Sequence, residues 1–139
     1  MSNNIFLDTN VLIYAFDVDE KAKHKKAQKI LRDCWDGENG AVSIQVLQGF
    51  YNAVTHKISK TISKSDARDV IRTYQVWPMP SITVDDIIDA SELEEQLKYS
   101  FWDSLIIVAA QKIEAELLYS ANMQDGQQIG SLKIVNPFN

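Results

Sequence analysis

The chain has 139 residues, of which 45% are hydrophobic, and its 19 acidic and 14 basic side chains give a formal net charge of −5. We expect one domain over residues 1–139 that buries about two thirds of the surface its unfolded form exposes, and a net negative charge argues against indiscriminate nucleic-acid binding. The single Cys34 excludes an internal disulfide, the two distant histidines offer no zinc site, and no apolar run is long enough to span a membrane, so we expect a soluble cytoplasmic protein.

The first predicted element is a strand over residues 4–7, followed directly by Asp8. A second apolar run at residues 11–16 begins after only Thr9 and Asn10, which is the pattern of a strand that leads into a helix. In the middle of a parallel sheet, Asp8 would lie at the carboxyl end of its strand, where open α/β sheets bind ligands. Aspartate is also a common helix N-cap, and both interpretations stay open at this point.

The next predicted elements are an amphipathic helix over residues 21–35, a strand over 41–43 and a helix over 44–58. The third of these carries a buried apolar stripe from Leu47 to Ile58. Gly49 lies on its polar face, although a glycine inside a helix costs about 1 kcal/mol relative to alanine. The position therefore either requires or tolerates the missing side chain.

Three capping boxes of the form Ser/Thr-x-x-Asp begin at Ser63, Thr83 and Ser100, and each predicts the start of a helix. The first helix extends to about residue 75, and the second to about 98 with Ile87 and Ile88 buried. The third begins near 101 and is strongly apolar. Late strands over 117–120 and 133–136 flank an Asp-Gly turn, and strands separated by helices indicate an α/β fold with a parallel sheet.

Charge is unevenly distributed along the chain. Residues 21–72 contain 11 bases and 5 acids, whereas residues 81–128 contain 2 bases and 10 acids. In the basic half, Lys64, Arg68 and Arg72 recur every four residues and share one face of a predicted helix. If the protein binds RNA, we expect these three residues and the lysines of residues 21–29 to contact phosphates.

Carboxylates are the best candidates for chemistry. The sequence has no glycine-rich phosphate loop and no Gly-x-Ser-x-Gly motif, and no serine is marked as a partner for either histidine. Two or more acids that hold Mg²⁺ or Mn²⁺ can hydrolyse a phosphodiester, and Asp8 and Asp103 are the candidate ligands. Asp103 ends a capping box like those of Asp66 and Asp86, so a purely structural role is the alternative for it.

Four separated segments together resemble the PIN domain, and most closely the VapC-like toxins of bacterial toxin–antitoxin pairs. The segments are residues 7–10 (Leu-Asp-Thr-Asn), 45–51 (Gln-Val-Leu-Gln-Gly-Phe-Tyr), 100–104 (Ser-Phe-Trp-Asp-Ser) and 126–138. The resemblance implies a three-layer fold, with a central parallel sheet and helices on both faces, and an acidic site that binds Mg²⁺ or Mn²⁺ and cleaves RNA. It also implies a cognate antitoxin and a homodimer.

Matched residue by residue, the resemblance makes Asp8 and Asp103 metal ligands and places Asn10, Ser43 and Asn122 beside them to orient water or phosphate. Two acids of the family pattern are absent, because Gly49 and Asn122 stand in their places. We therefore expect a ribonuclease with a weakened site, in which replacing Gly49 by glutamate strengthens metal binding.

Two alternatives remain. The first is a catalytically degenerate PIN domain that binds an antitoxin or RNA without cutting. The second is a phosphoaspartyl hydrolase with Asp8 as nucleophile, which ranks lower because Asn10 stands where a second acid would be needed.

Overall fold

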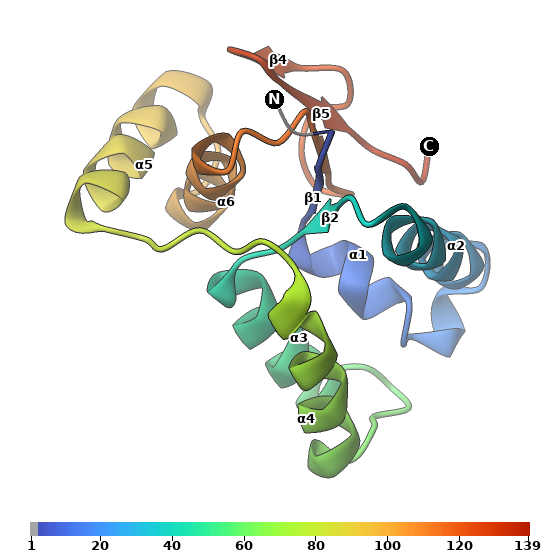
Figure 1. Cartoon of the computed structure of the whole chain (residues 1–139). Coiled ribbons are helices and arrows are strands. Elements are labelled where there is room, and N and C mark those ends of the chain that lie inside the picture. Colours follow the sequence, from blue (N-terminus) through green and yellow to red (C-terminus); the bar gives the residue numbers. More distant parts are fainter. Residues whose placement is uncertain (1–2) are drawn as a thin grey trace.

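The computed structural model describes residues 3–139, and Figure 1 shows its elements in chain order. They are β1 (Ile5–Leu7), α1 (Thr9–Tyr14), the 3₁₀ turn η1 (Val18–Glu20), α2 (Ala22–Gly37), β2 (Gly40–Ala41), α3 (Ile44–His56), α4 (Lys64–Thr73), the 3₁₀ turn η2 (Tyr74–Val76), α5 (Val84–Leu97), α6 (Phe101–Lys112), β3 (Leu117–Tyr119), β4 (Gln128–Ile129) and β5 (Leu132–Val135). No helix of residues 3–139 is long and apolar enough to cross a membrane.

The sheet has five strands in the order β2-β1-β3-β5-β4, and all neighbours are parallel except β4 and β5. This confirms the predicted α/β fold with a mainly parallel sheet and places β1 next to its centre. The short antiparallel β4 was not predicted, because two residues after a turn are too few to show an alternating pattern.

Helices cover both faces of the sheet. In Figure 1, α5 and α6 lie on one side of the strands and α1 and α2 on the other, while α3 and α4 form a pair that extends away from the sheet. The pair is attached through α1, which packs against α3, and α3 in turn packs against α4. The α1–α3 contact brings the third helix to the end of β1, where Asp8 lies.

One prediction about α5 is wrong. Ile87 and Ile88 were expected to be buried, but they are 46% and 52% exposed, and Ala90 is the buried residue of this helix. Ala90 and Leu93 pack against the α6 residues Leu105 and Val108. Because α5 packs mainly on α6, it buries only a narrow stripe, to which the partly buried Leu97 also belongs.

The three predicted N-caps are all formed, but only one is a complete capping box. In α5, the Thr83 backbone N–H donates to Asp86 while the Asp86 N–H donates to the Thr83 hydroxyl. In α4 and α6, the backbone N–H of the aspartate donates to the serine, at 3.0 Å for Asp66 and 3.1 Å for Asp103. The capping bond at α6 therefore uses the backbone of Asp103 rather than its carboxylate.

Candidate functional site

Four polar residues lie level with one another at the carboxyl ends of four adjacent strands. Phe6 pairs with Ala41, Leu7 with Tyr119, and Tyr119 with Val135. When these registers are extended to the level of Asp8, which follows β1, they reach Ser43, two residues after β2, and Ser120 directly after β3. They also reach Asn136, directly after β5. This row is the edge at which parallel α/β sheets bind ligands.

Asp8 is a buried carboxylate, 4% exposed, that accepts three hydrogen bonds. Its Oδ1 accepts from the backbone N–H of Thr9 at 2.7 Å, and its Oδ2 accepts from the Ser120 hydroxyl at 2.8 Å and from the Asn10 amide at 3.4 Å. Asp8 is also the N-cap of α1. Both interpretations left open by the sequence are therefore compatible, because the residue begins the helix while its second oxygen faces the row of polar residues.

Asp103 is close enough to act electrostatically on Asp8. Burial is the main cause that raises the pKa of Asp8, the Ser120 and Thr9 hydrogen bonds oppose it, and the negative charge of Asp103 raises it further. Burial also raises the pKa of the half-buried Asp103, and the hydrogen bond with the Ser100 side chain partly lowers it. Within residues 3–139, no lysine, arginine or histidine forms an ion pair with either carboxylate. The two acids therefore form a pair whose negative charge nothing in the described chain neutralises.

Ser120 is the site residue that sequence reasoning missed. It is completely buried, donates to Asp8, and accepts from the backbone N–H of Asn122 at 3.2 Å. A serine after a short strand has no distinctive spacing, and only the register of β3 against β1 reveals its place. Asn10 belongs to the same network, because its side-chain oxygen accepts from the Ala121 N–H at 3.0 Å.

Two further predicted site residues are less directly connected to Asp8. Ser43 is 2% exposed, and its hydroxyl caps α3 by accepting from the Val46 N–H at 3.3 Å. Asn122 is exposed at the rim and meets the site through its backbone N–H on Ser120. The structure thus joins Asn10 to Asp8 by a hydrogen bond, places Asp103 within electrostatic reach of Asp8, gives Ser43 a capping role and leaves the Asn122 side chain at the edge.

Gly49 has a packing role that the sequence did not reveal. A Cβ atom at this position would lie 2.8 Å from the γ-methyl of Thr9, the residue after Asp8. Thr9 is branched at Cβ and short, so it has few ways to move aside inside a helix. The glycine therefore permits a close approach of α3 to α1, and a glutamate there would have to displace Thr9.

The donor set fits a hard divalent cation with few charged ligands. Among residues 3–139, no group of three or more histidine, cysteine, aspartate or glutamate side chains could hold a metal ion. Asp8 and Asp103 remain as a pair, with the Asn10 amide and the Ser120 hydroxyl beside Asp8. Oxygen ligands of this kind suit Mg²⁺ or Mn²⁺, and two carboxylates imply weak binding. Asp125, whose carboxylate accepts from the backbone N–H of Asn136 at 2.8 Å, belongs to no such group of three or more within the described residues.

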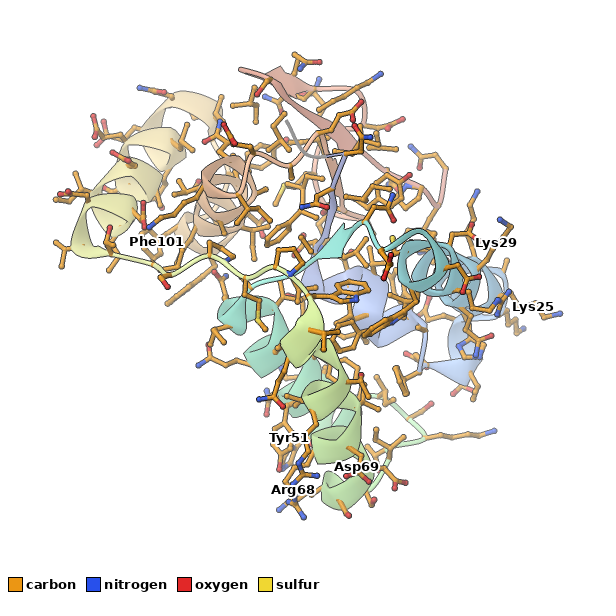
Figure 2. The ribbon with its side chains drawn as sticks, in the orientation of Figure 1. Lys25, Lys29, Tyr51, Arg68, Asp69 and Phe101 are labelled. Carbon is orange, nitrogen blue, oxygen red and sulfur yellow. The ribbon has the colours of Figure 1, made fainter. Side chains whose placement is uncertain are left out.

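The predicted basic stripe lies away from these acids. Lys64, Arg68 and Arg72 are exposed on α4, and Arg72 forms an ion pair with Asp69 at 2.7 Å. Figure 2 shows Arg68 near Tyr51 at the outer end of the α3–α4 pair, whereas Lys25 and Lys29 project from α2 on another side. The two basic groups are therefore separate surfaces.

Comparison with protein-family models gives one match, to the PIN domain, over residues 5–124. No curated protein sequence matches the chain.

Solved structures with the same fold include three from bacteria. One is VapC20 of Mycobacterium tuberculosis, described as a toxin that cleaves the sarcin-ricin loop, with 18% identity, a TM-score of 0.65 and coverage of 86% of this chain and 92% of that one. A toxin–antitoxin complex from Klebsiella pneumoniae has 19% identity, a TM-score of 0.64 and coverage of 96% and 98%. VapBC2 of Rickettsia felis, bound to a DNA fragment from its promoter, has 20% identity, a TM-score of 0.61 and coverage of 94% and 96%.

Proposed function

Because the chain belongs to the PIN domain family, we propose that it is a VapC-type ribonuclease whose Mg²⁺ or Mn²⁺ ion is held by Asp8 and Asp103. The observation that carries this proposal is the pair of carboxylates formed by the buried Asp8 after β1 and the half-buried Asp103 in the first turn of α6, neither of which has an ion pair with a cationic side chain of residues 3–139. Such a pair is costly unless a cation neutralises it. An RNA substrate would be met in the cytoplasm, where we place the protein.

Each neighbouring residue then has a defined task. The Ser120 hydroxyl fixes Oδ2 of Asp8, and Asn10 links Asp8 to the backbone after β3. The helices α1, α3 and α6 begin at Asp8, Ser43 and Ser100, so the positive ends of their dipoles favour a phosphate. When bound, the ion lowers the pKa of a coordinated water and neutralises charge on the phosphate. Asn10, Ser43 and Asn122 would orient this water or the phosphate.

A second candidate function is a PIN domain that binds RNA or an antitoxin without cutting. It is favoured by a specific observation, since the described residues offer two carboxylates where the family pattern has more, and Gly49 and Asn122 stand at the missing positions. Slow RNA cleavage would support the ribonuclease, whereas no cleavage at all would support the binding domain.

Calorimetric titration with Mn²⁺ and an RNA cleavage assay test the proposal on the variant Asp103→Asn. We expect this change to weaken Mn²⁺ binding at least about tenfold and to abolish cleavage, because it removes one of two charged ligands. Asp66→Asn is the matched control, since Asp66 holds the same position in the first turn of α4 that Asp103 holds in α6.

Three results are informative. Loss of Mn²⁺ binding in Asp103→Asn but not in Asp66→Asn supports the assigned site. Wild-type protein that binds Mn²⁺ and RNA but never cleaves supports the binding module. Equal Mn²⁺ binding by all three proteins means that the ligands lie elsewhere.

The partners of the proposed toxin are an RNA substrate, a cognate antitoxin and a second copy of the chain. RNA phosphates would contact the basic α4 face, mainly Lys64 and Arg68, because Arg72 is already paired with Asp69. The antitoxin is supported by the fold shared with structures from toxin–antitoxin complexes.

A further inference from the structure

Trp102 is the only aromatic residue of the described chain whose side chain is exposed. It is 64% exposed, whereas Trp77 is 7% exposed and packs against Trp35 with ring centroids 4.7 Å apart. The indole contacts the neighbouring Phe101 ring edge-on at 5.1 Å. An exposed aromatic ring beside a polar site can contribute binding energy, because a ligand that covers it buries a large apolar area.

The backbone beneath Trp102 is fixed from two sides. The Gln45 side-chain amide in the first turn of α3 donates to the Trp102 carbonyl oxygen at 3.0 Å. On the other side, the Ser100 hydroxyl accepts from the Asp103 N–H at 3.1 Å. The indole therefore has a defined place at the junction of α3 and α6, and a ligand would not have to order the backbone that carries it.

We propose that Trp102 is a stacking platform for a base of single-stranded RNA, next to the phosphate that lies at Asp8 and Asp103. The inference rests on the proposed function and adds a residue that positions the substrate. Trp102 and Asp103 are consecutive in the first turn of α6, with Cα atoms about 3.8 Å apart and side chains that diverge around the helix, so a base stacked on the indole would belong to a nucleotide beside the one whose phosphate passes the carboxylates. An indole stacks on any base, which suits an RNA site of relaxed sequence preference.

Apart from the Asp8–Asp103 carboxylates, whose charge a bound cation would neutralise, the charges around Trp102 suit a polyanion better than the overall charge suggests. The positive ends of α3 and α6 meet where Gln45 contacts Trp102. The acidic pocket lined by Asp86, Asp89 and Glu92 lies at the opposite end of α6, beside Lys112. Nucleic acid at Trp102 therefore approaches two helix N-termini and avoids that pocket.

A groove gives the RNA strand a course from Trp102 toward the basic face of α4. It begins at Ile44, the neighbour of Gln45, has a volume of about 440 Å³, and is lined without charged residues by Ile44, Leu47, Gln48, Tyr51 and Ile71. Lys64 and Arg68 precede Ile71 by seven and three positions and therefore share its face of α4. Figure 2 shows Tyr51 and Arg68 at this outer end.

The test is binding of a labelled eight-nucleotide oligoadenylate to the whole protein, measured by fluorescence anisotropy in EDTA so that no RNA is cut. We expect Trp102→Leu to weaken binding about 5- to 100-fold, which is the usual effect of losing one stacked base. Trp102→Tyr should restore most of the affinity, since it keeps an aromatic face. Val76→Ala is the control, because Val76 is an exposed apolar residue of another element, 79% exposed in the turn η2, and the affinity of this variant should equal that of the wild type.

Two further measurements distinguish stacking from charge. An abasic oligonucleotide of the same length should bind wild type and Trp102→Leu equally, because it has no base to stack. Trp102→Leu should leave the salt dependence of binding unchanged, whereas the double variant Lys64→Glu/Arg68→Glu should flatten it through lost phosphate contacts.

Other outcomes overturn the inference. If the wild type binds RNA and Trp102→Leu binds it equally well, the stacking role is wrong while the proposed function stands. If the folded wild type binds no RNA in EDTA and cuts none in Mn²⁺, the proposed function fails as well. If Trp102→Leu instead lowers the sedimenting mass without changing RNA affinity, Trp102 belongs to a protein interface.

Discussion

At the scale of single residues, Asp8 combines a structural and a chemical role that oppose each other in the absence of metal. Its carboxylate begins α1 and is held by Ser120, yet burial and Asp103 raise its pKa. For an acid, a raised pKa means that the folded state binds more protons than the unfolded state between the ordinary pKa of 3.8 and the raised value. Stability from this group is therefore lost as pH rises through that window.

We predict that Asp8→Asn stabilises the metal-free protein at neutral pH. The gain over wild type should be absent below pH 3.8 and grow as pH rises, by about 1.4 kcal/mol for each unit by which the pKa of Asp8 is raised. Urea unfolding in EDTA at several pH values measures it. Saturating Mn²⁺ should reverse the order, since only the wild type gains a ligand. A gain independent of pH would mean that the Asp8 charge is not strained.

Gly49 shows how contact decides the effect of a substitution that propensity alone would favour. We predict that Gly49→Ala is neutral or destabilising in the wild type, because the gain of about 1 kcal/mol in helix propensity meets an overpacking cost of about 1–3 kcal/mol against Thr9. In a Thr9→Ser background the γ-methyl is gone, and the same change should stabilise. Thermal unfolding of the four proteins of this cycle measures the coupling. Additive effects would mean that Thr9 rotates away freely.

At the scale of elements, local chemistry predicted where helices begin but not how much of each helix is buried. Ser63, Thr83 and Ser100 each cap the expected helix, since a cap is decided within three residues. The prediction that Ile87 and Ile88 of α5 are buried was wrong. Whether these side chains are buried depends on which element packs against them, and only the tertiary structure shows that.

In the candidate site too, some residues could be predicted from the local sequence and others only from the tertiary structure. Asp8 was predictable from the strand that precedes it, and Asp103 from its cap and its aromatic neighbours. Ser120, Gln45 and the contact of Gly49 with Thr9 depend on register and helix packing, which no spacing in the sequence encodes.

At the scale of the whole molecule, charge and exposed apolar surface are divided between different elements. The basic half contains α2, α3 and α4, and the acidic half contains α5 and α6, which Figure 1 shows on different sides. On α5, Val84, Ile87 and Ile88 are 72%, 46% and 52% exposed and form a stripe opposite the face that packs on α6. An uncovered stripe of this kind is a surface that self-association would bury.

We predict a homodimer at micromolar concentration, with twice the chain mass of 15.8 kDa. Sedimentation at low and high salt measures it. Because apolar burial rather than charge would hold the two copies, the dimer should persist in 0.5 M salt, at which surface charges are screened within about 4–5 Å. A species of 15.8 kDa at both salt concentrations would contradict the prediction.

The bond between Ser120 and Asp8 joins residues 112 positions apart, almost the whole length of the chain. During synthesis, β1 and Asp8 are made 112 residues before Ser120, which follows the partner strand β3. An unfinished chain therefore carries the acids without the sheet that aligns them, because a contact so distant in sequence forms only after the intervening segments have emerged. A nascent chain that ends before β3 therefore lacks the hydrogen bond that holds the Asp8 carboxylate.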